Sequence, residues 1–422
     1  MTISRRAFAF GACSTATALA APIVARAQAR PRVVVIGGGP GGSTVAKYLA
    51  RDSAGAIDVV MIDPSDFYMT CFHSNLWVGG LKNPGQITFN RVPIAKHGVK
   101  YVKQFATRID RERKMVALAD GAQVPYDRLV VAPGIDLDYA SVPGWSKAAE
   151  EAMPHAWKAG PQTELLIRRI DAVPDGGLIV MIAPPNPYRC PPGPYERVSM
   201  MAARLKAQGK TKARIVILDP KESFSKQPLF QQGWEKHYPG VVEWLGPKVH
   251  EGVKSVDPKT GEVVTGFETY KADLVNVIPA QMAGAIAREA GLTGTGKFCT
   301  IDPANMRSTV DPAISVLGDS SIAGDMPKSA FAANSQAKVA AQALRAELTG
   351  ARAFPARYAN TCWSLITADD CVKVGGVYAP ADGKIAATST FVSKLEETEQ
   401  QRHLQTEENL GWYSGFVADV FG

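Results

Sequence analysis

A cysteine in an unusual loop is the first residue of this sequence that could do chemistry. Cys190 lies in the proline-rich segment 183–194, between a predicted strand at 177–182 and a predicted helix at 195–208. In a nucleotide-binding β-α-β unit, this segment would carry glycines whose N–H groups face a pyrophosphate. Proline rings fill that space and have no N–H to donate. The segment therefore predicts a β-α-β unit that binds no NAD(P)H and has a thiol in the replaced loop.

A glycine-rich turn near the start of the chain predicts a cofactor site. A β-branched strand leads into Gly37, Gly39 and Gly42, spaced as G-x-G-x-x-G, and after a helical pattern a second strand ends in Asp63. The first glycine permits a tight turn, the second lets the backbone approach a pyrophosphate, and the third lets helix and strand pack closely. Asp63 is placed to bind ribose hydroxyls. This context favours a dinucleotide site over a glycine-rich turn in an unrelated α/β protein.

Two later segments resemble the FAD-binding segments of flavoproteins with two dinucleotide-binding domains. Residues 126–134 look like the strand and turn that end the first FAD segment, with Gly134 at the turn. Residues 309–319 resemble the second FAD signature, in which a strand delivers the terminal Asp319 to the ribityl and pyrophosphate region. A predicted helix from about Ser329 would aim its N-terminus at the flavin. Either segment alone could be a buried strand and a turn, but together they predict FAD rather than NAD at the first site.

The N-terminal residues predict export. A polar start with Arg5 and Arg6 is followed by an apolar, alanine-rich run and a small-x-small cleavage signal that ends at Ala29. The paired arginines favour a twin-arginine signal peptide over an ordinary secretory leader, because that route exports folded cofactor proteins. Cleavage would leave 44 basic and 40 acidic residues, too mild a balance to predict binding to nucleic acid. No later apolar run is long enough for a transmembrane segment, so we expect a soluble protein, periplasmic in a bacterium.

Three motifs carry a resemblance to the flavoprotein subunit of flavocytochrome c sulfide dehydrogenase, over essentially the whole chain after the leader. They are residues 68–75 (YMTCFHSN), 190–196 (CPPGPYE) and 360–364 (NTCWS). The resemblance implies that FAD is held covalently through Cys71, and that Cys190 and Cys362 form a redox-active disulfide above the flavin. It also implies sulfide as the substrate and a mono- or dihaem c-type cytochrome as the partner chain. Membrane-bound sulfide:quinone oxidoreductases share this fold and chemistry.

The resemblance and the order of the motifs together predict the domain organisation. The fold class is α/β, with two Rossmann-like dinucleotide-binding-type domains of glutathione-reductase-like arrangement and a small α+β C-terminal domain. The predicted boundaries are 1–29 for the signal peptide, 30–145 and 265–350 for the FAD-binding domain, 146–264 for the second Rossmann-like domain, and 351–422 for a C-terminal flavin- and cytochrome-interface domain. The C-terminal domain should contain a β-hairpin and an aromatic tail.

The resemblance also accounts for the cysteines, whose odd number after cleavage suggests an engaged thiol in an oxidising compartment. With Cys71 bonded to FAD and Cys190 paired with Cys362, Cys299 and Cys371 remain as free thiols or a second pair. Other interpretations stay open at this point. Cys71 could be a buried core thiol, and the predicted disulfide could be a structural bridge.

The implied reaction begins when hydrosulfide attacks the Cys190–Cys362 disulfide, which gives a persulfide on one cysteine and a thiolate on the other. Two electrons then reach FAD and leave singly. Glu196 is the candidate for proton handling, or else a solvated carboxylate that stabilises a helix start. The chain has no C-x-x-C-H motif, so haem c belongs to a partner chain only, and its histidines lack metal-ligand spacing, so we predict no metal. Rival functions are a sulfide:quinone oxidoreductase, a non-catalytic sulfur-binding flavoprotein and an NADH-dependent flavin reductase.

Overall fold

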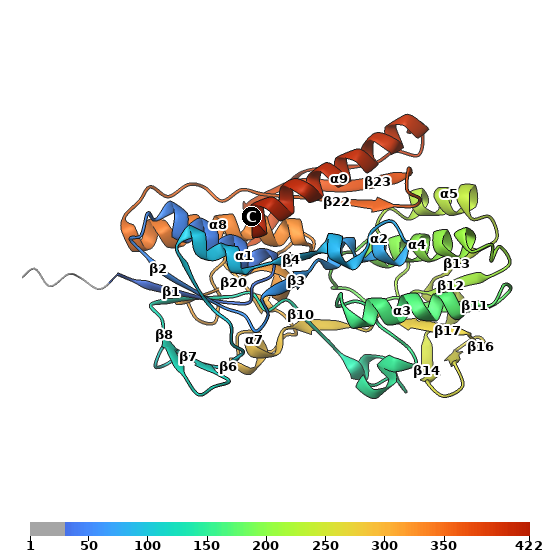
Figure 1. The fold of residues 1–422 in the computed structure, drawn as a ribbon, viewed down its shortest axis with the longest axis horizontal. Helices are drawn as coiled ribbons and strands as arrows, with labels where there is room; N and C mark the ends of the chain where they lie inside the picture. Colours follow the sequence, from blue (N-terminus) through green and yellow to red (C-terminus); the bar gives the residue numbers. More distant parts are fainter. Residues whose placement is uncertain (1–29) are drawn as a thin grey trace, which may run out of the picture. The chain divides into compact units, whose positions relative to one another are not determined.

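The structure, a computed structural model, describes residues 30–422 (Figure 1). The predicted signal peptide, including Cys13, lies outside the described residues. Residues Pro31–Gly422 pack as one unit. Within the described part of the chain, no helix is both long enough and apolar enough to cross a membrane.

Short runs of β-branched residues form the first sheet, which is parallel and buried on both faces, as such residues favour. Its strands, in spatial order, are β20 (Ile314–Val316), β9 (Arg128–Val131), β1 (Arg32–Ile36), β2 (Asp58–Ile62) and β5 (Val99–Val102). Helix α1 (Pro40–Asp52) connects β1 to β2 and packs beside helix α8 (Ala330–Thr349) (Figure 1). This is the predicted strand, glycine turn, helix and strand, with the predicted late helix lying against it.

A second parallel sheet forms the core of the next domain. Its strands, in spatial order, are β13 (Val242–Leu245), β12 (Arg214–Leu218), β11 (Leu178–Ile182) and β17 (Leu274–Val277). The longer helices of this part of the chain are α3 (Pro161–Ala172), α4 (Gly193–Ala207) and α5 (Gln227–His237). Because β17 pairs with β11, the domain continues past residue 264, where the sequence analysis ended it. Between β13 and β17 the chain forms a separate antiparallel sheet of three strands. These strands are β14 (Val253–Asp257), β15 (Glu262–Thr265) and β16 (Thr269–Lys271).

The C-terminal part is an antiparallel sheet covered by one long helix, as the predicted hairpin and aromatic tail suggested. The sheet consists of β22 (Tyr358–Leu365), β23 (Cys371–Ala381) and β24 (Lys384–Val392), and the helix is α9 (Glu399–Phe421). Helix α9 runs across β22 and β23 (Figure 1). Its buried Phe416 and Phe421 pack against Phe72, Phe89 and Tyr68 of the first domain. The aromatic tail therefore packs on the body of the protein.

The remaining elements are short and connect the three parts. The strands are β3 (Phe67–Met69) with β4 (Thr88–Asn90), β6 (Ala106–Asp110) with β7 (Met115–Leu118) and β8 (Gln123–Pro125), β10 (Ile135–Leu137) with β18 (Gln281–Ala283), and β19 (Cys299–Thr300) with β21 (Ser321–Ile322). The helices are α2 (Ser74–Val78), α6 (Pro247–His250) and α7 (Ala285–Glu289). The chain passes from the first domain to the second through β10 and returns through β18.

Candidate active site

The glycine-rich turn lines one wall of a cavity of about 360 Å³. Gly37 has φ +97°, and a Cβ there would stand 2.4 Å from the Ala132 oxygen, so the turn requires glycine. Gly39 lines the cavity, and a Cβ added to it would meet only Tyr68 within 4 Å. Gly42 lies behind the wall, where a Cβ would stand 1.7 Å from the Gly37 oxygen. The turn thus leaves room for a pyrophosphate at the N-terminus of α1.

Asp63 ends β2 at the same cavity and keeps part of its hydrogen-bonding capacity. Its carboxylate accepts hydrogen bonds of 2.7 Å from the Gly38 amide, 2.7 Å from Arg91 Nη1 and 3.0 Å from the Ser65 amide. An ionised carboxylate has about four acceptor sites, so one remains for a ribose hydroxyl. Arg91 also donates to the Gly38 carbonyl oxygen at 2.7 Å and fixes Asp63 against the glycine turn.

The other end of this cavity contains a buried carboxylate oxygen without a partner. Asp319 lines the cavity together with Gly134, and its Oδ1 has no hydrogen-bond donor. Burial raises the pKa of Asp319, and the charges of Arg189 and Lys328 oppose that rise. A buried polar atom normally has a partner, so the orphaned oxygen fits a hydroxyl-rich ligand such as the ribityl chain of FAD. The glycine cradle and this acceptor make the residues around the cavity suitable for FAD.

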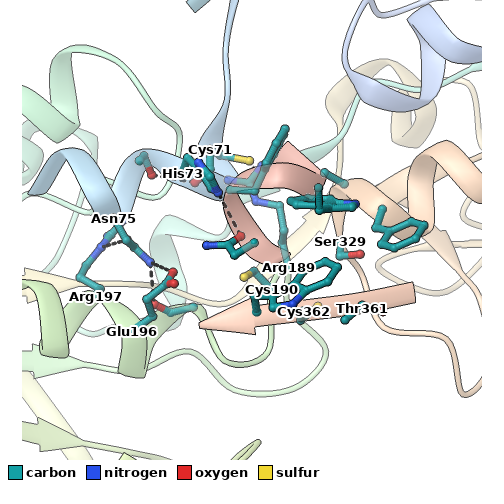
Figure 2. A pocket seen from close by; sticks show the side chains of 18 of the residues that line it. Cys71, His73, Asn75, Arg189, Cys190, Glu196, Arg197, Ser329, Thr361 and Cys362 are labelled. Atoms are coloured by element: carbon teal, nitrogen blue, oxygen red, sulfur yellow. Dashed lines mark hydrogen bonds between the residues drawn. The ribbon is translucent and has the colours of Figure 1, made fainter. Parts of the chain in front are cut away.

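A second, smaller cavity of about 60 Å³ adjoins the first, since Cys71 and Arg189 line both (Figure 2). Cys190 and Cys362 also line it, so three cysteines from separate parts of the chain meet around one space. The volume suits a few water molecules or a small anion. The first turn of α8 separates the two cavities, because Ser329 lines the smaller one and Ala333 the larger.

All five cysteines of residues 30–422 are free. The expected Cys190–Cys362 disulfide is therefore not formed in this structure, and neither is a second pair between Cys299 and Cys371. Cys190 and Cys362 line the smaller cavity as two free thiols. Burial raises the pKa of Cys190 well above its ordinary value, and the nearby Cys362 adds to that rise.

The backbone around Cys190 is strained and tightly packed. Cys190 has φ +58°, a left-handed conformation that is uncommon for residues other than glycine. Its amide donates a 2.8 Å hydrogen bond to the Lys328 carbonyl oxygen, and its own carbonyl oxygen accepts one of 2.8 Å from the Gly193 amide. A Cβ on Gly193 would stand 2.9 Å from Cys190 Sγ. The proline loop therefore holds this sulfur in one place, as strained backbone at functional sites commonly does.

Cys362 lies on β22, close to the N-terminus of α8. Asn360 Nδ2 donates to Cys362 Sγ at 3.4 Å, and the N-cap residue Ser329 donates to Asn360 Oδ1. Burial raises the pKa of the Cys362 thiol, and the Asn360 hydrogen bond opposes that rise. The strand and the helix start thus orient this sulfur together.

Glu196 is buried at the rim of the smaller cavity, which contradicts its interpretation as a solvated helix-start carboxylate. Only 5% of its surface is exposed. Its two oxygens accept hydrogen bonds of 2.9 Å from Asn75 Nδ2 and 3.0 Å from the Leu365 amide (Figure 2). Burial raises its pKa, and these two hydrogen bonds oppose the rise. A carboxyl group with a raised pKa at a cavity is suited to proton transfer.

Arg197 places a buried positive charge at the same cavity. Its guanidinium donates to neutral acceptors only, namely Asn75 Oδ1 at 3.1 Å and the carbonyl oxygens of His155 and Ala156 at 2.9 and 2.6 Å. It also lies 5.0 Å from the centre of the Trp157 ring. Burial lowers the pKa of Arg197 to about 9, so the group remains charged at neutral pH. A small anion in the cavity would be attracted to it.

His73 closes the side of the cavity next to Cys71. Its ring stacks on Tyr413 with centroids 3.7 Å apart, and Nε2 lies 3.3 Å from Asn409 Oδ1. Burial lowers the pKa of His73 to about 3, so the ring is neutral. Its Nδ1 has no hydrogen-bond partner. This side of the cavity therefore carries no charge from the histidine.

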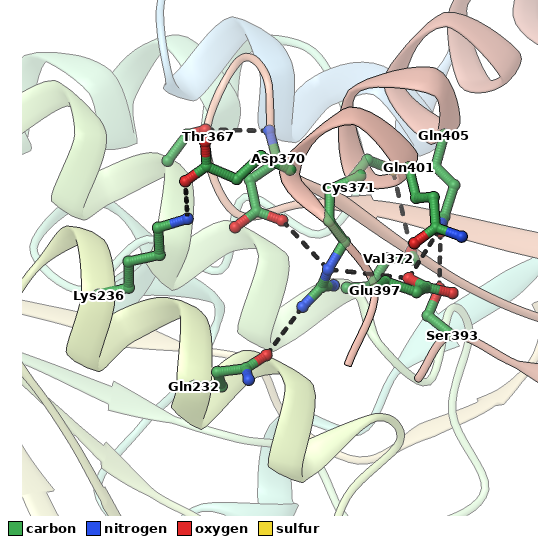
Figure 3. Close-up of polar contacts among 12 residues, drawn as sticks. Gln232, Lys236, Thr367, Asp370, Cys371, Val372, Ser393, Glu397, Gln401 and Gln405 are labelled. Atoms are coloured by element: carbon green, nitrogen blue, oxygen red, sulfur yellow. Dashed lines mark hydrogen bonds and ion pairs between the residues drawn. The ribbon is translucent and has the colours of Figure 1, made fainter. Parts of the chain in front are cut away.

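An ion cluster around Arg402 connects the C-terminal sheet and α9 to α5 of the second domain. Figure 3 labels its partners Gln232, Asp370 and Glu397. Arg402 of α9 donates to Gln232 of α5 at 3.1 Å and lies 3.8 Å from Asp370 and 3.7 Å from Glu397. Asp370, just before β23, also pairs with His237 of α5 at 2.8 Å. The cluster therefore ties β23 and α9 to α5 and helps to fix the position of β22.

The acid that ends the second strand of the second β-α-β unit is occupied by contacts within the protein. Asp219, which ends β12, is fully buried. It accepts hydrogen bonds from the Tyr195 hydroxyl at 2.6 Å, Trp244 Nε1 at 3.0 Å and the Lys221 amide at 3.0 Å, and Lys221 Nζ lies 2.6 Å away. Unlike Asp63, this carboxylate has no acceptor site left for a ribose hydroxyl.

The structure brings together nearly every site residue expected from the sequence, and it adds three more. Around the larger cavity lie Gly37, Gly39, Asp63, Cys71, Gly134 and Asp319, and around the smaller one Cys71, Cys190, Glu196 and Cys362. The three added residues are Arg91, Asn75 and Arg197, for which the sequence predicted no role. Asn75 belongs to the first cysteine motif and Arg197 directly follows Glu196, so their positions in the sequence could have indicated a role at the site. Arg91 lies in no motif. Residues 30–422 contain no His, Cys, Asp and Glu cluster that could hold a metal.

Comparisons with known proteins give a consistent assignment. The central domain described as "Sulfide dehydrogenase [flavocytochrome c] flavoprotein chain, central" matches residues 163–279. The domain "Flavocytochrome c sulphide dehydrogenase, flavin-binding" matches residues 354–421, and "Pyridine nucleotide-disulphide oxidoreductase" matches residues 31–160. A mitochondrial sulfide:quinone oxidoreductase of Dictyostelium discoideum is 23% identical over 73% of this chain and 69% of its own length.

Solved structures share the fold. The sulfide:quinone oxidoreductase of Aquifex aeolicus superposes with a TM-score of 0.71 over 92% of both chains, at 16% sequence identity. An NAD-dependent persulfide reductase from A. fulgidus superposes with a TM-score of 0.59 over 89% of this chain and 77% of its own, also at 16% identity. At such low identity these likenesses establish the fold alone.

Proposed function

Because the chain belongs to the family of flavocytochrome c sulfide dehydrogenase flavoprotein chains, a sulfide-oxidising family, we propose that it oxidises hydrosulfide to sulfane sulfur or polysulfide. Cys190 and Cys362 would act as a redox-active pair. The observation that carries the proposal is the convergence of these two thiols on one small cavity that adjoins the larger cavity lined by the glycine turn.

The chemistry on the protein starts from the Cys190–Cys362 disulfide. Hydrosulfide attacks one sulfur, the S–S bond breaks, one cysteine becomes a persulfide, and the other leaves as a thiolate. The buried charge of Arg197 would draw the anion into the cavity. Glu196 would take up and return the proton, since burial raises its pKa and so favours the protonated form. The small volume of the cavity, about 60 Å³, favours hydrosulfide over a bulky organic thiol.

FAD is the cofactor that the larger cavity supports, and when bound it would supply a two-electron acceptor for the reduced pair. Gly39 leaves backbone space for its pyrophosphate, Asp63 keeps an acceptor for its ribose, and Asp319 offers the orphaned oxygen. We further propose that Cys71 holds FAD covalently. Support comes from its position on the boundary between the two cavities.

A c-type cytochrome is the proposed electron acceptor, with haem c on that partner chain. Quinone is the alternative acceptor, suggested by the names of the sulfide:quinone oxidoreductases to which the chain is similar. NAD(P)H is not expected to react, and the filled acceptor sites of Asp219 and the proline loop support this. We propose the periplasm as the location, reached through the twin-arginine signal.

The deciding experiment uses the purified mature protein. Sulfide should bleach the flavin absorbance within one turnover, and oxidised cytochrome c should restore it faster than a soluble quinone does. Faster recovery with quinone would assign the alternative acceptor. An unchanged flavin spectrum in sulfide would support a non-catalytic sulfur-binding protein instead, and rapid bleaching by NADH would favour a flavin reductase. Mass spectrometry of the same sample reports the cleavage site, the flavin on Cys71 and the Cys190–Cys362 bond.

A further inference from the structure

A buried lysine stands behind the strand that carries Cys362. Lys226 directly precedes α5, and 7% of its surface is exposed. Its Nζ donates hydrogen bonds of 3.1 Å to the Cys362 carbonyl oxygen, 2.9 Å to Ser364 Oγ and 2.9 Å to the Val372 carbonyl oxygen. These acceptors use all three N–H groups of an ammonium. The charge is therefore held in one position against β22 and β23.

This ammonium has no carboxylate in direct contact. Its acceptors are neutral, and none of the ion pairs formed within residues 30–422 includes Lys226. Moving a charge out of water is costly, so a buried lysine usually pairs with a carboxylate. Lys221 in the same domain has that arrangement, with Nζ 2.6 Å from Asp219. The positive charge of Lys226 is therefore not balanced by a carboxylate in direct contact, and an anionic group that balances it must lie farther away.

The backbone of Lys226 is also strained. Its φ of +64° is a left-handed conformation, unusual for a residue with a long side chain. Such a conformation persists only where the surroundings enforce it, and it is a recurrent feature of functional sites. Its side chain makes three hydrogen bonds to β22 and β23, and its carbonyl oxygen accepts from the Leu229 and Phe230 amides at the start of α5.

Three of the four groups that favour the charged form of Lys226 line the smaller cavity, and the first of the four, Cys371, lies outside it. Burial lowers the pKa of Lys226, and four groups favour its charged form: Cys371, Cys362, Glu196 and Cys190. The titratable groups that act on or respond to the Cys362 thiol are Lys226 before α5, Glu196 of α4, Cys190 before α4 and Tyr378 of β23. Among these groups, Lys226 is the one whose positive charge lowers the pKa of Cys362.

We propose that Lys226 is a positioning residue whose buried ammonium stabilises the anionic form of Cys362. This inference rests on the proposed function for its role in turnover. When hydrosulfide breaks the disulfide, an electron pair stays on the leaving sulfur and the attacked sulfur becomes a persulfide. Cys362 carries an anionic sulfur in either role, as a thiolate or as an ionised persulfide, and Lys226 stabilises both. Lys226 also anchors the strand, so loss of charge and loss of anchoring must be measured separately.

The test follows the reactivity of Cys362 in the reduced holoprotein. The rate at which methyl methanethiosulfonate modifies Cys362 is measured from pH 6 to 10 by peptide mass spectrometry, for the wild type and for Lys226→Met and Lys226→Arg. Lys226→Met should react about tenfold more slowly at neutral pH, with its inflection at higher pH, because only the thiolate reacts. Lys226→Arg keeps the charge and should recover most of the rate.

Lys221→Met is the matched control, since it removes a partly buried lysine from the same domain without touching β22. It should leave the Cys362 profile unchanged, and thermal unfolding of each variant reports anchoring. Identical Cys362 profiles for the wild type and Lys226→Met would overturn the inference. An equal decrease in the modification rate in Lys226→Met and Lys226→Arg would also overturn it. Sulfide turnover is assayed separately. A wild type that fails to oxidise sulfide removes the proposed function, while the modification profiles still decide the role of Lys226.

Discussion

The amide of Cys190 donates a 2.8 Å hydrogen bond to the carbonyl oxygen of Lys328, directly before the N-cap of α8. This contact joins the proline loop of the second domain to the helix that separates the two cavities. The same helix start reaches Cys362 through Ser329 and Asn360. One helix N-terminus therefore contacts both cysteine-bearing segments beside the larger cavity lined by the glycine turn.

Replacing either cysteine of the pair should abolish sulfide oxidation and leave FAD bound. Cys190→Ser and Cys362→Ser each remove one sulfur that disulfide exchange requires, whereas the proposed FAD contacts lie in the other cavity. Sulfide-dependent cytochrome c reduction and the flavin-to-protein absorbance ratio measure the two effects. Cys299→Ser is the control, because that thiol is fully buried and lines neither cavity. Turnover above a tenth of wild type in Cys190→Ser would remove the disulfide from the mechanism.

Asp319→Ala should weaken FAD binding, because it removes the orphaned acceptor of the larger cavity. Loss of one hydrogen bond to a charged group is worth about 1.5–3 kcal/mol, or roughly a tenfold to hundredfold rise in Kd. The measurement belongs in a Cys71→Ser background, where FAD is free to dissociate, and uses flavin fluorescence during titration. Asp325→Ala, an exposed carboxylate outside both cavities, should bind FAD as the background does. Equal affinities for FAD in Asp319→Ala and the background would show that the Asp319 oxygen does not bind FAD.

The predictable parts of this protein are those that short segments specify. The glycine turn, Asp63, Gly134 and Asp319 each belong to a strand with its following turn, so local pattern placed them at one sheet edge. The Cys190–Cys362 relationship came from the family resemblance, since nothing in their spacing along the chain joins the proline loop to β22.

The unpredicted parts depend on contacts between distant segments. Arg91 reaches Asp63 only because the loop around β4 folds back over the glycine turn. Asn75 links Glu196 to Arg197 only after α2 packs on α4. The boundary at residue 264 failed for the same reason, because β17 belongs to its sheet through pairing with β11 rather than through its own pattern.

Glu196→Gln should change how stability depends on pH. Burial raises the pKa of Glu196 in the folded protein above its ordinary value of 4.5. The folded state then binds more protons than the unfolded chain above that pH, so this contribution to stability is fully present below about pH 4.5 and lost as pH rises through the folded pKa. Glutamine is neutral at every pH, so the variant does not lose this stability as pH rises. Urea unfolding from pH 4 to 8 should show the free energy of unfolding of the variant improving relative to wild type as pH rises. Parallel curves would mean that folding does not shift the pKa of Glu196.

Arg402→Met should destabilise the whole protein more than any surface ion-pair variant. Arg402 is 6% exposed, and its loss would leave the buried carboxylate of Asp370 and the partly buried carboxylate of Glu397 with one cation fewer. Breaking a buried ion pair by removing one partner costs about 3–5 kcal/mol. Lys236→Met is the matched control, because Lys236 pairs with the exposed Glu399, and an exposed pair contributes about 0–1 kcal/mol. Denaturant unfolding of both variants gives the comparison. The cluster also fixes β22 through β23, so Arg402→Met should in addition raise the KM for sulfide. An unchanged KM with reduced stability would show that the cluster has only a structural role.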